Sequence, residues 1–285
     1  MMNYKTKKKV KNGIKFSFLH IFFILICFAT LIPILYAISV SFNAENALLT
    51  SDFSFIPADF TLDNYIAVFT EEPVLLWFGN TLILAVSTVV LSMAVGVPAA
   101  YVFSRWRFTG RKTILKNLLL LYSFPSVLSM FAIYRILQTF GMVNSRIGLI
   151  LVYTGTMAVF ALLNMKGYFD SIPVEIEEAA SIDGANDMVL VVKIVMPLAR
   201  PSLIVTAVNI LIYVWNEYLY ATTFMTGADK YTLAAGLYSL QATEISGSWP
   251  VFAAASIVVS LPILIIFFSI QKYMTSGLTV GGVKG

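Results

Sequence analysis

The chain has 285 residues, of which 59% are hydrophobic and only 12% are charged, and its net charge is +4. Its mean hydropathy of +0.84 excludes an ordinary water-soluble domain, so we expect most of the chain to lie in lipid. The excess of basic residues follows their placement in short loops and does not indicate nucleic acid as a partner. A single cysteine and a single histidine, Cys27 and His20, exclude an internal disulfide and argue against a His/Cys metal site.

Six apolar stretches meet or approach the roughly 20 residues of helix that cross a hydrocarbon core about 30 Å thick. Closed β-barrels would instead show short segments of alternating polarity, which this sequence lacks. The first stretch far exceeds the roughly 7–15 residues of a signal-peptide core, so we expect an uncleaved anchor. The sequence therefore predicts an all-α polytopic membrane protein with six spans, over residues 16–42, 74–103, 118–134, 147–165, 203–225 and 251–270.

Basic residues gather in the loops on one side of the predicted bundle. Sixteen of the 19 Lys and Arg residues lie before the first span, after the second and fourth, and after the sixth. Only Arg135, Arg146 and Lys230 lie on the other side, together with eight acidic residues. Short cytoplasmic loops carry an excess of Lys and Arg. We therefore expect both termini, and the segment 170–200, to lie in the cytoplasm.

The first outward loop, residues 43–73, is rich in aromatic side chains. Thr61 is expected to cap a short helix within this loop. Two interpretations of the aromatic residues stay open, an interfacial belt and a small packed cap beneath an external partner. The aromatic residues are Phe53, Phe55, Phe60, Tyr65 and Phe69.

The longest predicted cytoplasmic segment, residues 170–200, separates two membrane-length stretches. Ser171 is expected to cap a helix that opens at Pro173, and acidic residues fill its first turns, where the helix dipole favours negative charge. Asp183-Gly184 is a turn signal that ends this helix, and a second amphipathic stretch covers residues 188–196. The pattern predicts a short helix–turn–helix lying flat beneath the bilayer. From the residues alone, it is either a docking element for a soluble partner or an amphipathic loop on lipid headgroups.

Polar residues recur at three- or four-residue spacing along the fifth predicted span, so we expect them on one helix face. Glu217 is the only acidic residue well inside a span, where an acid costs about 2.5–3.5 kcal/mol, so it should face the bundle interior or a water-filled cavity. The stripe either lines a path through the bundle or joins helices, through a second membrane subunit or through Asn80, Thr81 or Ser87 on the second span. Its members are Thr206, Asn209, Tyr213, Asn216, Glu217 and Tyr220.

The segment 170–200 also carries a specific spacing. Glu178-Ala179-Ala180 is followed after three residues by Gly184, after nine more by Ile194, and then by Met196-Pro197. This spacing resembles the "EAA" loop of permease subunits of binding-protein-dependent ABC importers, in which Leu-Pro ends the pattern, so only Met196 departs. The chain is most similar to the smaller six-span permease of maltose/maltodextrin-type transporters, in the carbohydrate-uptake branch. The resemblance extends to residues 166–169, 215–217, 231–234 and 277–285.

The resemblance implies a type I ABC importer transmembrane fold and a coupling helix that seats in a cytoplasmic ATPase. The implied partners are a second homologous permease, two copies of the ABC ATPase, an extracytoplasmic sugar-binding protein and a sugar, expected to be an oligosaccharide. The candidate pathway residues are Asn209, Tyr213, Asn216, Glu217 and Tyr220. The coupling role falls on Glu178, Ala179, Ala180, Asp183, Gly184, Ile194 and Pro197.

The chain itself lacks the Gly-x-x-x-x-Gly-Lys-[Ser/Thr] loop that cradles phosphates. We therefore expect ATP and Mg to bind a separate ATPase, and this chain to be no enzyme and to hold no cofactor or metal. An ion-driven secondary transporter is the alternative, but it would need several intramembrane ionisable residues. The expected layout, in a bacterial or archaeal cell membrane, is a basic tail (1–15), the first span with its outward loop (16–73), the permease core (74–272) and a C-terminal tail (273–285).

Overall fold

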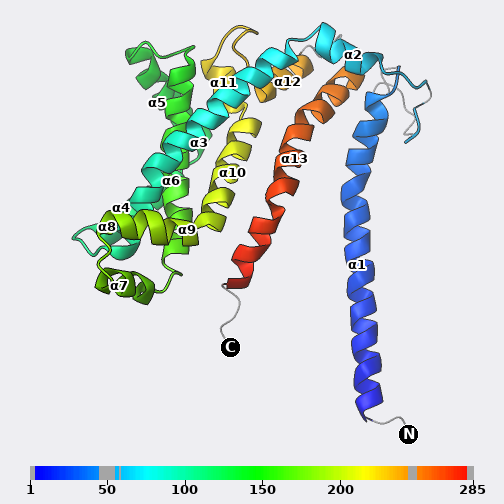
Figure 1. Ribbon diagram of the computed structural model, residues 1–285. Helices are drawn as coiled ribbons and strands as arrows, with labels where there is room; N and C mark the ends of the chain where they lie inside the picture. The colour runs from blue at the N-terminus through cyan, green and yellow to red at the C-terminus, as the bar shows by residue number, and fades with distance from the viewer. Residues whose placement is uncertain (1–3, 45–54, 58, 243–248, 281–285) are drawn as a thin grey trace. The chain divides into compact units, whose positions relative to one another are not determined.

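The computed structural model describes residues 4–44, 55–57, 59–242 and 249–280. Within these ranges the regular structure is helical (Figure 1), apart from one isolated antiparallel bridge between Asn43 and Phe60. Four helices are long and apolar enough to cross a membrane, and the number rises to six if each of two sharply bent pairs counts as one span. The prediction of an all-α, multi-span protein is confirmed.

The chain divides into two compact units, residues 1–72 with 240–258, and residues 73–239 with 259–285. In the first unit, α1 (Tyr4–Ser41) includes most of the expected basic tail, and α2 (Asp63–Thr70) is the short helix expected in the outward loop. Thr61 does not occupy the N-cap position, although its hydroxyl accepts a hydrogen bond from the Asp63 N–H at 3.1 Å. Phe53 lies outside the described residues.

Three helices form the centre of the second unit. Here α3 (Val74–Arg105) packs mainly against α6 (Arg146–Phe169), and α10 (Arg200–Asn216) packs against both. Gly96 allows the close approach of α3 and α6, because a Cβ at this position would lie 2.6 Å from Ala161 Cβ and 2.8 Å from the Ala158 carbonyl oxygen. Small residues at such crossings are typical of membrane helices, which gain stability from close packing.

The third predicted span is not one continuous helix. It consists of α4 (Arg111–Tyr122) and α5 (Ser126–Thr139), which meet at an angle of 97°. Pro125 causes the break, since proline lacks an N–H donor and disfavours helical backbone in the residue before it. A second bend, of 74°, separates residues 187–198 from α10.

The fifth predicted span is also interrupted. After α10 ends at Asn216, the chain continues as α11 (Leu219–Phe224) and α12 (Leu233–Ala242). The last helix, α13 (Trp249–Val280), contains the sixth predicted span and extends into the expected C-terminal tail. The residues 281–285, which end one of the resemblance stretches, lie outside the described residues.

Candidate functional site

The segment 170–200 forms the predicted helix–turn–helix. Its first helix is α7 (Val174–Ile182), and its second part consists of α8 (Asp187–Val189), a π-helical turn η2 (Leu190–Val195) and α9 (Met196–Leu198). Gly184 lies at the turn between them with φ +88°, a conformation that favours glycine. Asn186 caps α8, since its side-chain oxygen accepts a hydrogen bond from the Val189 N–H at 2.9 Å.

The start of α7 differs from the prediction. Ser171 does not cap this helix, because its hydroxyl donates instead to the Tyr168 carbonyl oxygen at 2.6 Å. Pro173 occupies the N-cap position with extended backbone (ψ 131°), and no side chain caps the helix. A preceding turn at the end of α6 places Ser171 too early in the chain to reach the first N–H groups of α7.

The predicted coupling residues lie mostly on the outer surface of this segment. Two large apolar side chains, Ile182 and Met188, flank the turn and are 87% and 72% exposed. Apolar groups exposed together on a protein surface commonly mark a contact with another molecule. Of the predicted coupling residues, Glu178, Ala179, Asp183, Gly184 and Pro197 are exposed, and Ala180 and Ile194 are half-buried.

The inner side of the segment carries a buried ion pair. Glu177, the residue before the predicted motif, forms an ion pair with Arg105 at the end of α3, with 2.7 Å between the charged atoms. Both side chains are about nine-tenths buried. The Tyr101 hydroxyl donates to the second Glu177 oxygen at 2.9 Å. Arg105 also donates to the Ile172 carbonyl oxygen at 3.1 Å. These contacts fasten α7 to the end of α3.

A second polar link joins the ends of α3 and α6. The Ser104 hydroxyl donates to Asp170 at 2.7 Å, and Lys166 forms an ion pair with the same carboxylate at 2.5 Å. Burial raises the pKa of Asp170, but the hydrogen bonds from Lys166 and Ser104 outweigh it, so the net pKa lies below its ordinary value of 3.8. Asp170 is therefore a carboxylate at neutral pH, and it links the ends of α3 and α6 near the start of α7.

Apolar packing completes the attachment. Phe169, Ile172, Leu190 and Val195 are buried in one cluster with residues of α3 and α6. The Phe169 ring lies edge-on to Tyr101 at 5.8 Å. Interiors of this kind are close-packed and transmit strain. The segment thus combines an exposed outer turn with an underside joined to α3 and α6; the additional cluster members are Val97, Ala100, Met165 and Ala199.

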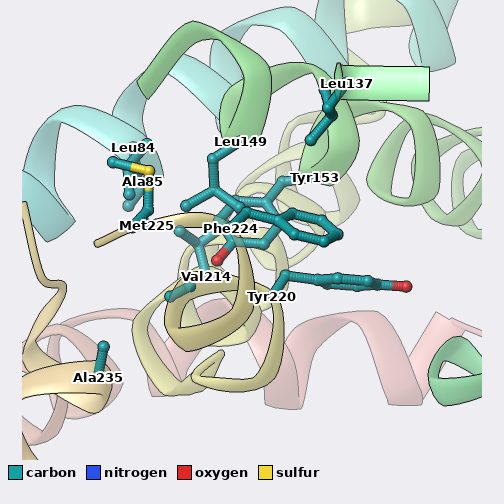
Figure 2. Packing of buried hydrophobic residues seen from close by; sticks show 11 residues of the cluster. Leu84, Ala85, Leu137, Leu149, Tyr153, Val214, Tyr220, Phe224, Met225 and Ala235 are labelled. Carbon is teal, nitrogen blue, oxygen red and sulfur yellow. The ribbon is translucent and has the colours of Figure 1, made fainter. Parts of the chain in front are cut away.

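The expected polar stripe does not lie on one continuous helix face. Glu217 lies at the break after α10 with extended backbone, and its carboxylate accepts the Tyr220 and Ala221 N–H groups at 2.8 and 3.3 Å. The Tyr153 hydroxyl of α6 donates to the same carboxylate. Figure 2 shows Tyr153 and Tyr220 within the buried cluster around this junction. A carboxylate that satisfies the first N–H groups of α11 explains why the break occurs here.

The remaining stripe residues are divided between different environments. Asn209 and Asn216 are exposed, and the Asn216 amide donates within its own helix to the Ile212 carbonyl oxygen. Tyr213 lies edge-on to Tyr153, with ring centroids 6.1 Å apart. Thr206 accepts a hydrogen bond from Asn164 of α6 at 2.6 Å. Within this chain the stripe therefore joins α10 to α6. The expected partners were a second permease or Asn80, Thr81 and Ser87 on α3.

Comparison with known proteins identifies the chain at the level of family. Residues 92–280, about two thirds of the chain, match the family described as the binding-protein-dependent transport system inner membrane component. The chain belongs to this family. Its membership, together with the candidate spans, places this inner membrane component in the membrane as a multi-pass protein.

Relatives of this inner membrane component are similar along nearly their whole length. Two proteins of Bacillus subtilis (strain 168) are each 34% identical to it. One is the galactooligosaccharides transport system permease protein GanQ, and the alignment covers 97% of this chain and 98% of GanQ. The other is the maltodextrin transport system permease protein MdxG, and the alignment covers 100% of both chains.

A solved structure has the same fold as the inner membrane component. It is the crystal structure of a bacterial ABC transporter involved in the import of the acidic polysaccharide alginate. One of its chains matches with a TM-score of 0.76 and 25% identity, over 96% of this chain and 99% of that chain. The predicted importer transmembrane fold is thereby confirmed.

The sequence did not reveal the buried polar network of this inner membrane component. Glu177, Arg105 and Tyr101 were not among the predicted site residues, and Glu177 pairs with a residue 72 positions away. Helical periodicity reports contacts three or four residues apart, so it gives no signal for such a pair. The available hint was that Arg105 follows the second apolar stretch and Glu177 directly precedes the motif.

Proposed function

We propose that this chain is a transmembrane permease subunit of an ATP-driven, binding-protein-dependent importer of a sugar, expected to be an oligosaccharide. The proposal rests on its family and on full-length relatives named for galactooligosaccharides and maltodextrin. Both termini face the cytoplasm in this proposal, because sixteen of the 19 basic residues lie on their side of the bundle.

The proposed assembly contains this chain, a second homologous permease, two copies of an ATPase and an extracytoplasmic sugar-binding protein. ATP and Mg bind the ATPase, since the phosphate-cradling loop is missing from this sequence. The binding protein docks on the outward loops. Transport then proceeds by alternating access, with no covalent step in this chain.

The turn around Gly184 is the proposed point of coupling. The observation that carries the proposal is that one side of the segment is exposed and the other side is bound to α3. On the outer side, Ile182 and Met188 are exposed and available to a cleft of the ATPase. On the inner side, the Arg105–Glu177 ion pair joins α7 to α3. An ATPase that moves the turn therefore pulls on α3 and, through Phe169 and Asp170, on α6.

Substitution of the turn tests this coupling. Gly184→Leu places a side chain at φ +88°, which L-residues rarely adopt, and Glu178→Lys reverses a charge on the exposed surface. Both variants should insert in the membrane normally but lose most ATP-driven uptake or fail to retain the ATPase. The measurements are uptake into vesicles loaded with ATP and co-purification of the ATPase.

Gly141→Leu is the matched control. Gly141 also has positive φ (+65°), and at both positions a Cβ would meet no atom within 4 Å, but Gly141 lies between α5 and α6. The control should retain ATPase binding and uptake. Normal ATPase binding together with normal uptake in the Gly184 and Glu178 variants would show that this turn is not the coupling element. Uptake that needs only an ion gradient would contradict the importer itself.

A further inference from the structure

A half-open cavity of about 540 Å³ is lined by α4, α5, α6 and the junction between α10 and α11 in the second unit, and several of its lining residues are exposed. Small-molecule sites commonly have volumes of roughly 300–1,000 Å³. Gly155, Thr156 and Met157 line the cavity from the middle of the 24-residue helix α6. If α6 crosses the bilayer, the cavity therefore lies near the centre of the membrane.

Two of the helix interruptions of this unit border the cavity. Phe124 and Ser126 line it at the 97° bend between α4 and α5, and Tyr220 lines it directly after the break at Glu217. Irregular backbone at membrane depth is tolerated where it is buried in protein or lines a water-filled cavity. The Tyr220 hydroxyl donates to the Ser126 carbonyl oxygen at 3.3 Å, which joins the two breaks.

The lining combines aromatic surface with hydroxyl groups that are free to bind a ligand. The hydroxyls of Tyr122, Ser126, Thr156 and Tyr213 donate to no other residue in the part of the chain that the structure describes. Apolar and aromatic side chains make up most of the remaining wall. Among the described lining residues there is no Asp, Glu, Lys or Arg.

This pattern discriminates between possible occupants. A lipid chain or an apolar helix of a neighbouring subunit would leave four hydroxyls without partners, which is unfavourable away from water. A sugar ring has hydroxyl groups at its edge and a face of C–H groups, and it matches both parts of the lining. A charged sugar would find no cation in the described lining, and the Glu217 carboxylate beside Tyr220 opposes an anion.

We propose that this cavity is a subsite for one ring of a neutral oligosaccharide during translocation. Tyr213 and Tyr220 supply the aromatic surface, and Tyr122, Ser126 and Thr156 supply hydroxyl partners. The assignment rests on the proposed function as a sugar importer and adds that this subunit itself contacts the sugar. It also predicts a preference for neutral sugars, in contrast to the acidic polysaccharide named for the structurally similar transporter.

The test uses the complete transporter in vesicles with internal ATP, with maltotriose and galactobiose as neutral probes and digalacturonate as an acidic probe. Tyr213→Phe and Thr156→Val each remove one hydroxyl that has no partner in the described chain, and both keep the side-chain shape. Each should lower the amount of sugar imported per ATP hydrolysed about three- to tenfold, as expected for one lost hydrogen bond. ATP hydrolysis stimulated by the binding protein should remain.

Filling the cavity provides a second variant. At both Gly155 and Gly79 a Cβ would meet no atom within 4 Å, but only Gly155 lines the cavity. Gly155→Leu should therefore abolish uptake, whereas Gly79→Leu in α3 should not.

Four outcomes would overturn the proposal in distinguishable ways. If wild-type vesicles import neither neutral sugar, the proposed function fails and the subsite with it. If the wild type imports a neutral sugar but Tyr213→Phe, Thr156→Val and Gly155→Leu match it in sugar per ATP, the subsite alone fails. Loss of the second permease from these variants during purification would show that a protein helix fills the cavity. Uptake of digalacturonate would contradict the preference for neutral sugars.

Discussion

Two adjacent glutamates of α7 have opposite environments. Glu177 is buried against Arg105 and Tyr101, whereas Glu178 is exposed on the outer surface. Successive residues of a helix differ by about 100° in direction, so one side chain can point inward while the next points outward. Glu177 therefore attaches the segment to α3, whereas Glu178 is available for contact with a partner.

Alanine substitution at these two positions should separate the roles. Glu177→Ala leaves the Arg105 guanidinium buried without its counter-ion, and breaking a buried ion pair costs about 3–5 kcal/mol. We expect the melting temperature of the detergent-solubilised protein to fall by several degrees, as measured by a thermal shift assay. Glu178→Ala makes the same exchange at an exposed position and should leave the melting temperature unchanged. Equal melting temperatures for the two variants would show that the ion pair does not anchor α7.

Glu217 shows where residue-level prediction succeeded and where it did not. The cost of an acid inside a span predicted that this side chain faces the bundle interior or a water-filled cavity, and its carboxylate accepts a hydrogen bond from Tyr153 of α6. Those partners, Tyr153 and the N–H groups of α11, depend on a helix break that spacing cannot reveal. A pattern of polar residues at helical intervals assumes a continuous helix, so it misplaced Tyr220 on the same face as Asn209.

At the scale of elements, long apolar helices were predicted well and their interruptions were not. The helices α3, α6 and α13 contain the predicted second, fourth and sixth spans. Their lengths follow from the thickness of the bilayer. The bend between α4 and α5 was harder to predict, because a proline within a membrane helix is compatible with a mild kink as well as with a sharp turn.

The crossing of α3 and α6 makes an element-scale prediction. Gly96→Leu should separate the two helices, since even a Cβ there would lie 2.6 Å from Ala161 Cβ. Overpacking of this kind typically costs about 1–3 kcal/mol, and a larger side chain costs more. We expect weaker assembly and a lower yield of folded protein, measured by size-exclusion chromatography in detergent. Gly167→Leu is the control, because its Cβ would meet nothing within 4 Å, and a similar loss from both variants would contradict the packing explanation.

At the scale of the whole molecule, the chain combines transmembrane helices with a small exposed turn and lacks the sequence of an ATP-binding loop. Composition and loop charge were sufficient to predict the membrane class, because the bilayer constrains apolar length directly. The tertiary network beneath the turn could not be predicted, because it joins residues that are distant in the sequence. The proposed coupling depends on both features, since an exposed turn without an anchored underside would transmit little motion.

Site-directed cross-linking tests the coupling claim most directly. With Cys27 replaced by serine, the chain has no cysteine, and a new cysteine at Ile182 would replace a side chain that is 87% exposed beside the turn. We predict that Ile182→Cys cross-links to the ATPase in the assembled transporter and that the yield changes between the ATP-bound and nucleotide-free states. Ile147→Cys, on a residue that is also exposed (64%) at the start of α6, should give no such product. An intact, transporting assembly in which Ile182→Cys never cross-links to the ATPase in either state would contradict the account.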